Sequence, residues 1–113
     1  MRTFAHVTGG GLADNLGRVL PKGLEAVLER RSWTPAPIFS LIAQRGRIER
    51  LEMERTFNMG VGMVAIVAPE DTDRAQAILT ARHVDNWVLG TVKRGEQADA
   101  AGRAELVGDY ARF

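Results

Sequence analysis

Residues 5 to 12 read Ala-His-Val-Thr-Gly-Gly-Gly-Leu, and this stretch decides how the first part of the chain folds. Residues 4 to 8 are short, apolar and β-prone, and Leu12, Leu16 and Leu20 recur at helical spacing after the three glycines. The pattern predicts a strand, a glycine turn and a helix. Three glycines remove every Cβ from the turn and allow positive φ angles, so a phosphate can approach the backbone N–H groups closely.

Strands and helices alternate along the rest of the chain. The predicted strands cover residues 24–29, 59–68, 87–92 and 104–107, and the predicted helices cover 35–46, 48–55 and a stretch that begins at Pro69. This alternation predicts an α/β (α+β) fold in which a mixed β-sheet packs against helices.

Two of these elements carry expectations about burial. Residues 59 to 68 are apolar apart from their glycines and rich in β-branched side chains, which predicts a central strand covered on both faces. In the helix that follows Pro69, the side chains of Ala75, Ile78 and Leu79 are expected to face inward.

The composition fits one domain with no strongly charged partner. The chain has 113 residues, of which 45% are hydrophobic, and its formal net charge is +1, so neither nucleic acid nor an anionic membrane is implied as a partner. Cysteine is absent and the two histidines are far apart, so no metal site is expected. No segment resembles a signal peptide or a membrane span, which predicts a cytoplasmic protein.

The glycine turn is a candidate anion site. The helix start after Gly9-Gly10-Gly11 adds partial positive charge and unpaired N–H donors. Thr8 can add a hydroxyl donor, and Asn15 can reach the same ligand. Asp14 opposes this interpretation, because a carboxylate in the first turn repels a phosphate unless it points away or acts through magnesium. A tight turn without any ligand is the alternative.

Two polar residues near glycines are further candidates. His6 can donate to a phosphate or exchange a proton with a substrate, and the alternative is a structural histidine at a strand end. Asn58 is either a turn former or a hydrogen-bonding partner of a substrate. The spacing of Gly60, Gly62 and Ala65 matches a dinucleotide fingerprint, but a β-type run follows these glycines instead of a helix, which excludes that motif.

The other conspicuous side chains are interpreted as structural. Trp33 and Trp87 are assigned to core or interface packing. Arg30-Arg31 and the charges from Arg45 to Arg55 are interpreted as a solvated face.

Several blocks of the chain follow one another as in a known enzyme family. They are residues 5–12, Asn15 with residues 18–21, Ser32-Trp33, residues 37–39, Glu52-Met53, residues 55–63 (Arg-Thr-Phe-Asn-Met-Gly-Val-Gly-Met) and residues 87–90. In this order they resemble the phosphoribosylformylglycinamidine cyclo-ligase (aminoimidazole ribonucleotide synthetase) family. The resemblance extends to about Thr91, and the tail from Lys93 matches no part of the family pattern.

The resemblance implies a reaction and its partners. Enzymes of this family use ATP and Mg²⁺ to close formylglycinamidine ribonucleotide to aminoimidazole ribonucleotide in purine biosynthesis. ATP activates the formyl oxygen as a phosphate ester, and the amidine-side nitrogen attacks and expels phosphate. The family enzyme is a homodimer of two-domain subunits whose nucleotide site lies mainly on the N-terminal domain. Residues 1–113 are then a partial C-terminal domain without the N-terminal ATP-binding domain, and are expected to be inactive alone.

The resemblance also assigns roles to the candidate residues. Thr8 to Gly11 and the following helix bind the ribonucleotide phosphate or the transferred phosphoryl group. Asn15 and Asn58 give polar support, and His6 is a catalytic proton or hydrogen-bond partner. The alternatives are a non-catalytic phosphate-binding or dimerisation fragment, a related member of the same ATP-using superfamily, and a small interaction domain without a ligand.

Overall fold

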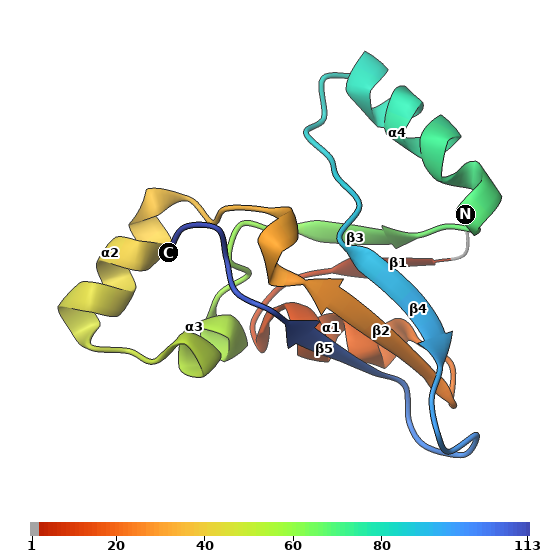
Figure 1. Cartoon of the computed structure of the whole chain (residues 1–113), viewed down its shortest axis with the longest axis horizontal. Coiled ribbons are helices and arrows are strands. Elements are labelled where there is room, and N and C mark those ends of the chain that lie inside the picture. The colour runs from red at the N-terminus through yellow and green to blue at the C-terminus, as the bar shows by residue number, and fades with distance from the viewer. Residues whose placement is uncertain (1–2) are drawn as a thin grey trace.

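The computed structural model describes residues 3 to 113 and contains two small sheets flanked by helices (Figure 1). The elements in chain order are β1 (Thr3–His6), α1 (Gly11–Val19), β2 (Leu24–Glu29), the 3₁₀ turn η1 (Arg30–Ser32), α2 (Pro37–Gly46), α3 (Arg50–Thr56), β3 (Met63–Ile66), the 3₁₀ turn η2 (Pro69–Asp71), α4 (Thr72–Ala81), β4 (Gly90–Arg94) and β5 (Arg103–Val107). Among these residues, no helix is both long and apolar enough to cross a membrane.

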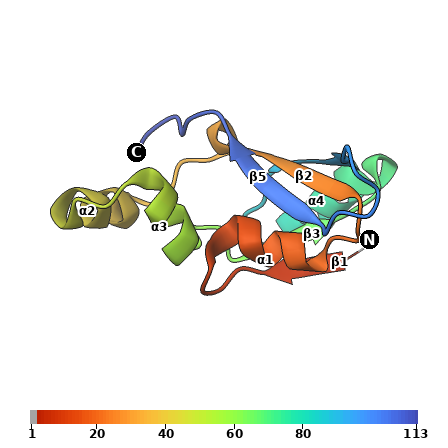
Figure 2. The ribbon, with the colours of Figure 1, turned by 90° about the horizontal axis from the view of Figure 1, so that it is seen from below.

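The five strands of the described residues form one three-stranded sheet and one two-stranded sheet. One sheet has the strand order β4-β2-β5, in which β2 is antiparallel to β4 and parallel to β5. The other is an antiparallel pair of β1 and β3 that places His6 opposite Met63. Helix α1 lies between β1 and the three-stranded sheet (Figure 2). The predicted α/β (α+β) fold with a mixed sheet is therefore confirmed.

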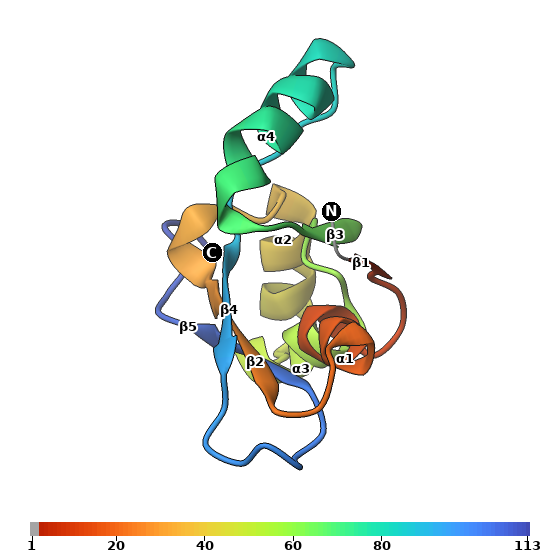
Figure 3. The same ribbon diagram turned by 90° about the vertical axis from the view of Figure 1, so that its right-hand side faces the viewer.

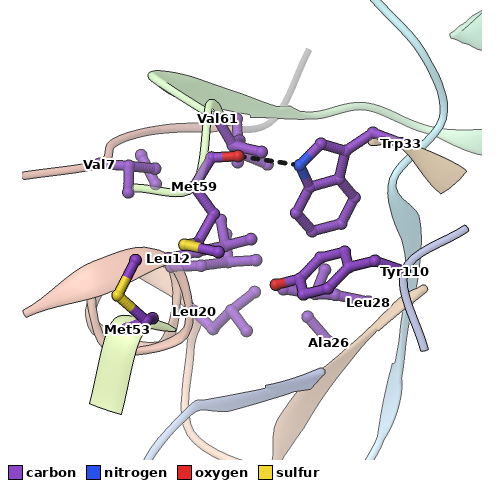
Figure 4. Packing of buried hydrophobic residues seen from close by; sticks show 13 residues of the cluster. Val7, Leu12, Leu20, Ala26, Leu28, Trp33, Met53, Met59, Val61 and Tyr110 are labelled. Atoms are coloured by element: carbon purple, nitrogen blue, oxygen red, sulfur yellow. Dashed lines mark hydrogen bonds between the residues drawn. The ribbon is translucent and has the colours of Figure 1, made fainter. Parts of the chain in front are cut away.

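The core forms where α1, α3 and the three-stranded sheet meet. The largest fully buried side chains are Leu12, Leu16, Met53 and Met59. The first two are one helical turn apart on α1, which is why the periodicity predicted this helix correctly. Trp33 is also in this core, and its indole N–H donates to the carbonyl oxygen of Met59 at 3.0 Å (Figure 4). The packing role predicted for Trp33 is thus confirmed.

The strand predicted over residues 59 to 68 is shorter and less covered than expected. Only four of these residues form β3, and β1 is its one partner among the described residues. Val64 is buried between two exposed neighbours, so the prediction of a central strand covered on both faces is wrong. The reason is local, because Met59 (φ 53°) and Gly60 (φ 96°) take left-handed conformations and interrupt the extended chain. Met59 then reaches the core from a turn.

Helix α4 does not face inward as predicted. It projects from the body of the molecule and packs mainly against the neighbouring η2 turn (Figure 3). None of its residues is buried, and Ile78 is 52% exposed. Ala75 and Leu79 are only partly buried. The period of the sequence shows which face of a helix is apolar but not whether another element lies against that face.

The other predicted elements are present with shifted ends. Helices α2 and α3 begin two residues later than predicted, and β5 begins one residue earlier. The strand predicted from Trp87 starts only at Gly90, where a Cβ would lie 1.9 Å from the carbonyl oxygen of Val27 on β2. The glycine is what allows this close approach.

A buried charged cluster joins three distant parts of the chain. Arg30 donates through Nε and Nη2 to the two carboxylate oxygens of Glu54, at 2.8 and 2.9 Å. Its Nη1 donates to the carbonyl oxygen of Gly108 at 2.9 Å, and the hydroxyl of Tyr110 donates to Glu54. Arg30 and Glu54 are each 6% exposed, so their interpretation as part of a solvated face is wrong. Their partners are 24 to 78 residues away in sequence, where no local pattern indicates them.

The pKa values of Arg30 and Tyr110 are both raised, which preserves the protonated forms that donate these hydrogen bonds. The hydrogen bond to Glu54 raises the pKa of Arg30, so the guanidinium stays charged. Burial, and then the hydrogen bond to Glu54, raise the pKa of Tyr110 well above its ordinary value. The phenol therefore remains a hydrogen-bond donor.

Replacing Glu54 by glutamine tests how far the fold depends on this cluster. Glu54→Gln leaves the buried charge of Arg30 without its carboxylate, and we expect the free energy of unfolding to fall by about 3–5 kcal/mol in urea titrations. The matched control is Asp109→Asn, which removes the exposed ion pair with Arg50 (2.6 Å) on the same helix. That change should lower stability by less than about 1 kcal/mol. Equal losses in the two variants would contradict the assignment.

Candidate functional site

The glycine loop, defined as residues Thr8 to Gly11, joins β1 to α1. Gly10 and Gly11 have φ angles of 97° and 82°, which side chains with a Cβ adopt only with strain. The N–H of Gly11 donates to the carbonyl oxygen of Thr8 at 3.1 Å and closes the turn. The predicted strand, glycine turn and helix are therefore confirmed, including the positive φ angles.

Asn15 holds the glycine loop from the inside. This side chain is only 8% exposed, and its Nδ2 lies 2.7 Å from the carbonyl oxygen of Gly11. The same atom lies 3.2 and 3.3 Å from the carbonyl oxygens of Thr8 and Gly9. Its Oδ1 accepts a hydrogen bond from the Thr8 hydroxyl at 3.4 Å. Because an amide has two N–H donors, both are already committed to the loop. Both N–H groups of Asn15 are thus used within the loop, so Asn15 can assist ligand binding by holding the loop in its shape.

The glycine loop has a packed side and an open side. A Cβ on Gly11 would lie 1.8 Å from the carbonyl oxygen of Glu54, so α3 presses directly against the loop there. A Cβ on Gly9 would meet nothing within 4 Å. An anion therefore has access to the loop at Gly9 and Gly10 but not at Gly11.

Two opposite charges border the open side. From the position of a Cβ on Gly10, Nη2 of Arg18 lies at 3.7 Å and Oδ2 of Asp14 at 3.8 Å. Asp14 thus does not point away from the loop, and Arg18, four residues later on the same helix face, offsets its charge. Helix α1 begins here with Gly10 as its N-cap and no side chain capping the first turn. The i,i+4 spacing of Asp14 and Arg18 is a signal that could have placed Arg18 at the loop from the sequence.

His6 lies on the same face of the chain as Thr8. Both residues are exposed, whereas Val7 between them is buried. The imidazole is therefore placed where it can meet a ligand bound at the open side of the loop. Its catalytic role stays a prediction.

The second glycine block, residues 60 to 62, lies beside the end of β1. The N–H of Val7 donates to the carbonyl oxygen of Gly62 at 3.0 Å, and a Cβ on Gly60 or Gly62 would meet nothing within 4 Å, so this hydrogen bond does not require glycine there. Asn58 is partly buried, and its Oδ1 accepts a hydrogen bond from the N–H of Gly60 at 2.8 Å. This contact is that of a turn former. A role toward a substrate stays a prediction for Asn58.

Acidic side chains are sparse around this site. Within residues 3–113, no three His, Asp or Glu side chains are grouped so that they can hold a metal ion. Asp14 is the carboxylate that borders the open side of the loop. A divalent ion here needs further ligands, which a phosphate and water can supply.

Residues 1 to 101 match the sequence model of the family described as AIR synthase related protein, C-terminal domain. The chain belongs to this family. The match includes the glycine loop, the second glycine block and Glu54, and it continues past Lys93, where the resemblance by motif ended.

Several curated relatives of this AIR synthase related family are similar to most of the chain. A Streptomyces fradiae protein named as a candidate phosphoribosylformylglycinamidine cyclo-ligase is 53% identical over 112 residues, which are 98% of this chain and 62% of that protein. The phosphoribosylformylglycinamidine cyclo-ligase of Anaeromyxobacter dehalogenans is 48% identical over 88% of this chain and 29% of its own length. That of Methylobacillus flagellatus is 42% identical over 95% of this chain and 30% of its own length. The chain thus spans only part of each relative.

Alanine substitutions within the glycine loop test its packed and open sides. Gly11→Ala places a methyl group against the Glu54 carbonyl and strains the backbone, so we expect the free energy of unfolding to fall by about 3 kcal/mol or more in urea titrations. Gly9→Ala adds the same methyl group in open space and should change stability by less than about 0.5 kcal/mol. The two-sided description of the loop fails if both variants are equally stable.

Proposed function

We propose that this chain supplies the C-terminal part of a phosphoribosylformylglycinamidine cyclo-ligase, a ligase of purine biosynthesis. The observation that carries the proposal is the similarity to proteins named for this activity, at 48–53% identity over 88–98% of the chain. The substrate is then formylglycinamidine ribonucleotide, and the reaction closes its imidazole ring at the expense of ATP. Such a pathway enzyme works in the cytoplasm.

The glycine loop is the proposed phosphate site of this reaction. Its open side offers N–H groups at the start of α1, where the helix dipole favours an anion. Arg18 adds a positive charge beside Gly10. The loop then holds either the phosphate of the ribonucleotide or the phosphoryl group transferred to the formyl oxygen.

Asp14, which borders the open side of the loop, is the proposed protein ligand of Mg²⁺. Mg²⁺ is commonly held by one or two carboxylates together with phosphate oxygens and several water molecules. Asp14 at the open side can act as such a ligand when a phosphate is bound. The rest of the ATP site, and the contacts of a homodimer, then belong to the remainder of the full-length enzyme.

His6 is the proposed proton or hydrogen-bond partner of the substrate. Its exposed imidazole shares a face with Thr8, and an imidazole can donate to a phosphate oxygen or exchange a proton during ring closure. Asn58 is proposed to support the site by holding the turn before the second glycine block.

A non-catalytic phosphate-binding or dimerisation fragment is the second candidate function. It is favoured by the open side of the glycine loop, which by itself offers a phosphate access to backbone N–H groups. This candidate predicts phosphate binding by the chain without turnover.

A chimera tests the proposed activity. The chain replaces the matching segment of the Anaeromyxobacter dehalogenans cyclo-ligase, and ADP release is measured with formylglycinamidine ribonucleotide and ATP. We expect turnover, and we expect Gly10→Val to lower kcat/KM by about 100-fold because its side chain strains the loop and covers the open side. Asp109→Asn, an exposed change outside the loop, serves as the control for a tolerated change. A folded chimera without turnover would support the second candidate, and unchanged kinetics of Gly10→Val would remove the loop from the site.

His6→Ala in the same chimera tests the proton role. If the imidazole exchanges a proton with the substrate, kcat falls by about 10²- to 10⁴-fold while the chain still binds inorganic phosphate. Wild-type turnover would leave His6 with a structural role only.

A further inference from the structure

We infer that Tyr110 is a positioning residue that acts through Glu54 to hold the glycine loop in its binding shape. The part of this inference that concerns phosphate rests on the proposed function, whereas the mechanical link between Tyr110 and the loop stands on the packing alone.

The first step of the link is the contact between the loop and α3. The carbonyl oxygen of Glu54 occupies the space where Gly11 lacks a side chain, at 1.8 Å from the ideal Cβ position. No other atom separates the two backbones there. A displacement of Glu54 away from the loop would therefore remove the surface on which Gly11 rests.

The second step is the fixation of Glu54 by its side chain. Arg30 holds both carboxylate oxygens from the end of β2, and the hydroxyl of Tyr110 donates to one of them from the opposite end of the chain. Every buried polar side-chain atom among the described residues has a hydrogen-bond partner, so the cluster is complete as it stands. Loss of the Tyr110 hydroxyl removes one of the three hydrogen bonds to the carboxylate and leaves Glu54 less firmly fixed.

Tyr110 is also linked, through Trp33, to the residue before the second glycine block. Its ring packs edge-on against Trp33, with centroids 5.2 Å apart, and the indole N–H of Trp33 donates to the carbonyl of Met59, which directly precedes that block (Figure 4). Tyr110 thus contacts Glu54, which supports the glycine loop, through its hydroxyl. Through its ring it contacts Trp33, which holds Met59.

The segment that carries Tyr110 lies beyond the family match. The family sequence model ends at residue 101, whereas the Streptomyces fradiae relative is similar over 98% of this chain. The hydroxyl of Tyr110 thus comes from residues after β5, outside the segment that the family model matches.

Hydrogen exchange of the full chain tests the inference with Tyr110→Phe, which keeps the ring and removes the hydroxyl. We expect exchange of the Gly11 amide, whose N–H donates to the carbonyl oxygen of Thr8, to become roughly tenfold faster. Amides in the pairing of β2 with β4 should be unchanged relative to wild type. A merely structural role would accelerate exchange at both places together, and that result, or an unchanged Gly11 amide, would overturn the inference.

Two further variants make the result specific. Asp109→Asn removes the exposed ion pair between Asp109, next to Tyr110, and Arg50 on α3. This variant should leave the exchange rates of the loop amides unchanged. Glu54→Asp keeps the carboxylate but draws it back from Tyr110, so it should reproduce the selective loop effect if Tyr110→Phe does not fold.

Titration with inorganic phosphate, followed at the loop amides, separates this inference from the proposed function. The affinity of wild type for phosphate should exceed that of Tyr110→Phe by several-fold. If wild-type amides do not respond to phosphate, the proposed phosphate site fails, while the exchange comparison still decides whether Tyr110 holds the loop.

Discussion

The backbone of Glu54 fills the space that Gly11 leaves by having no side chain, and the rest of the site depends on this contact. Gly11 can rest on α3 only because both partners are fixed. Asn15 donates hydrogen bonds to the carbonyl oxygens of the loop, and Arg30 and Tyr110 donate hydrogen bonds to the carboxylate of Glu54. A buried ion pair of this kind contributes little net stability, but its disruption is strongly destabilising because the remaining charge stays buried.

This arrangement explains how the glycine loop can be rigid and accessible at once. The side that faces the core is fully occupied by hydrogen bonds and backbone contacts, whereas the side at Gly9 is open. Preorganised donors bind an anion without first having to be ordered, which favours affinity. In the proposed phosphate site, Arg18 adds a positive charge, while Asp14 disfavours a bare anion and suits one that carries a divalent ion.

The sequence predicted the elements whose signals are local. Glycine residues, helical spacing and strand alternation placed β1, the loop, α1, β2 and β5 within one or two residues of their ends. The burial predicted from the sequence was wrong where burial depends on contact with another helix or strand. Within the described residues 3–113, α4 packs mainly against the η2 turn and none of its residues is buried, and residues 59 to 68 divide at Met59 into a core turn and a strand with one exposed face.

The sequence alone determined the fold class, the shape of the glycine loop and the family, because glycine conformations and motif order are local properties of the chain. Only the tertiary structure decided that Asn15 binds the loop carbonyls. It also decided that Arg30, Glu54 and Tyr110 meet in the interior. Their contacts join residues as much as 78 positions apart, and such pairings are set by how helices and strands pack, which no local pattern specifies.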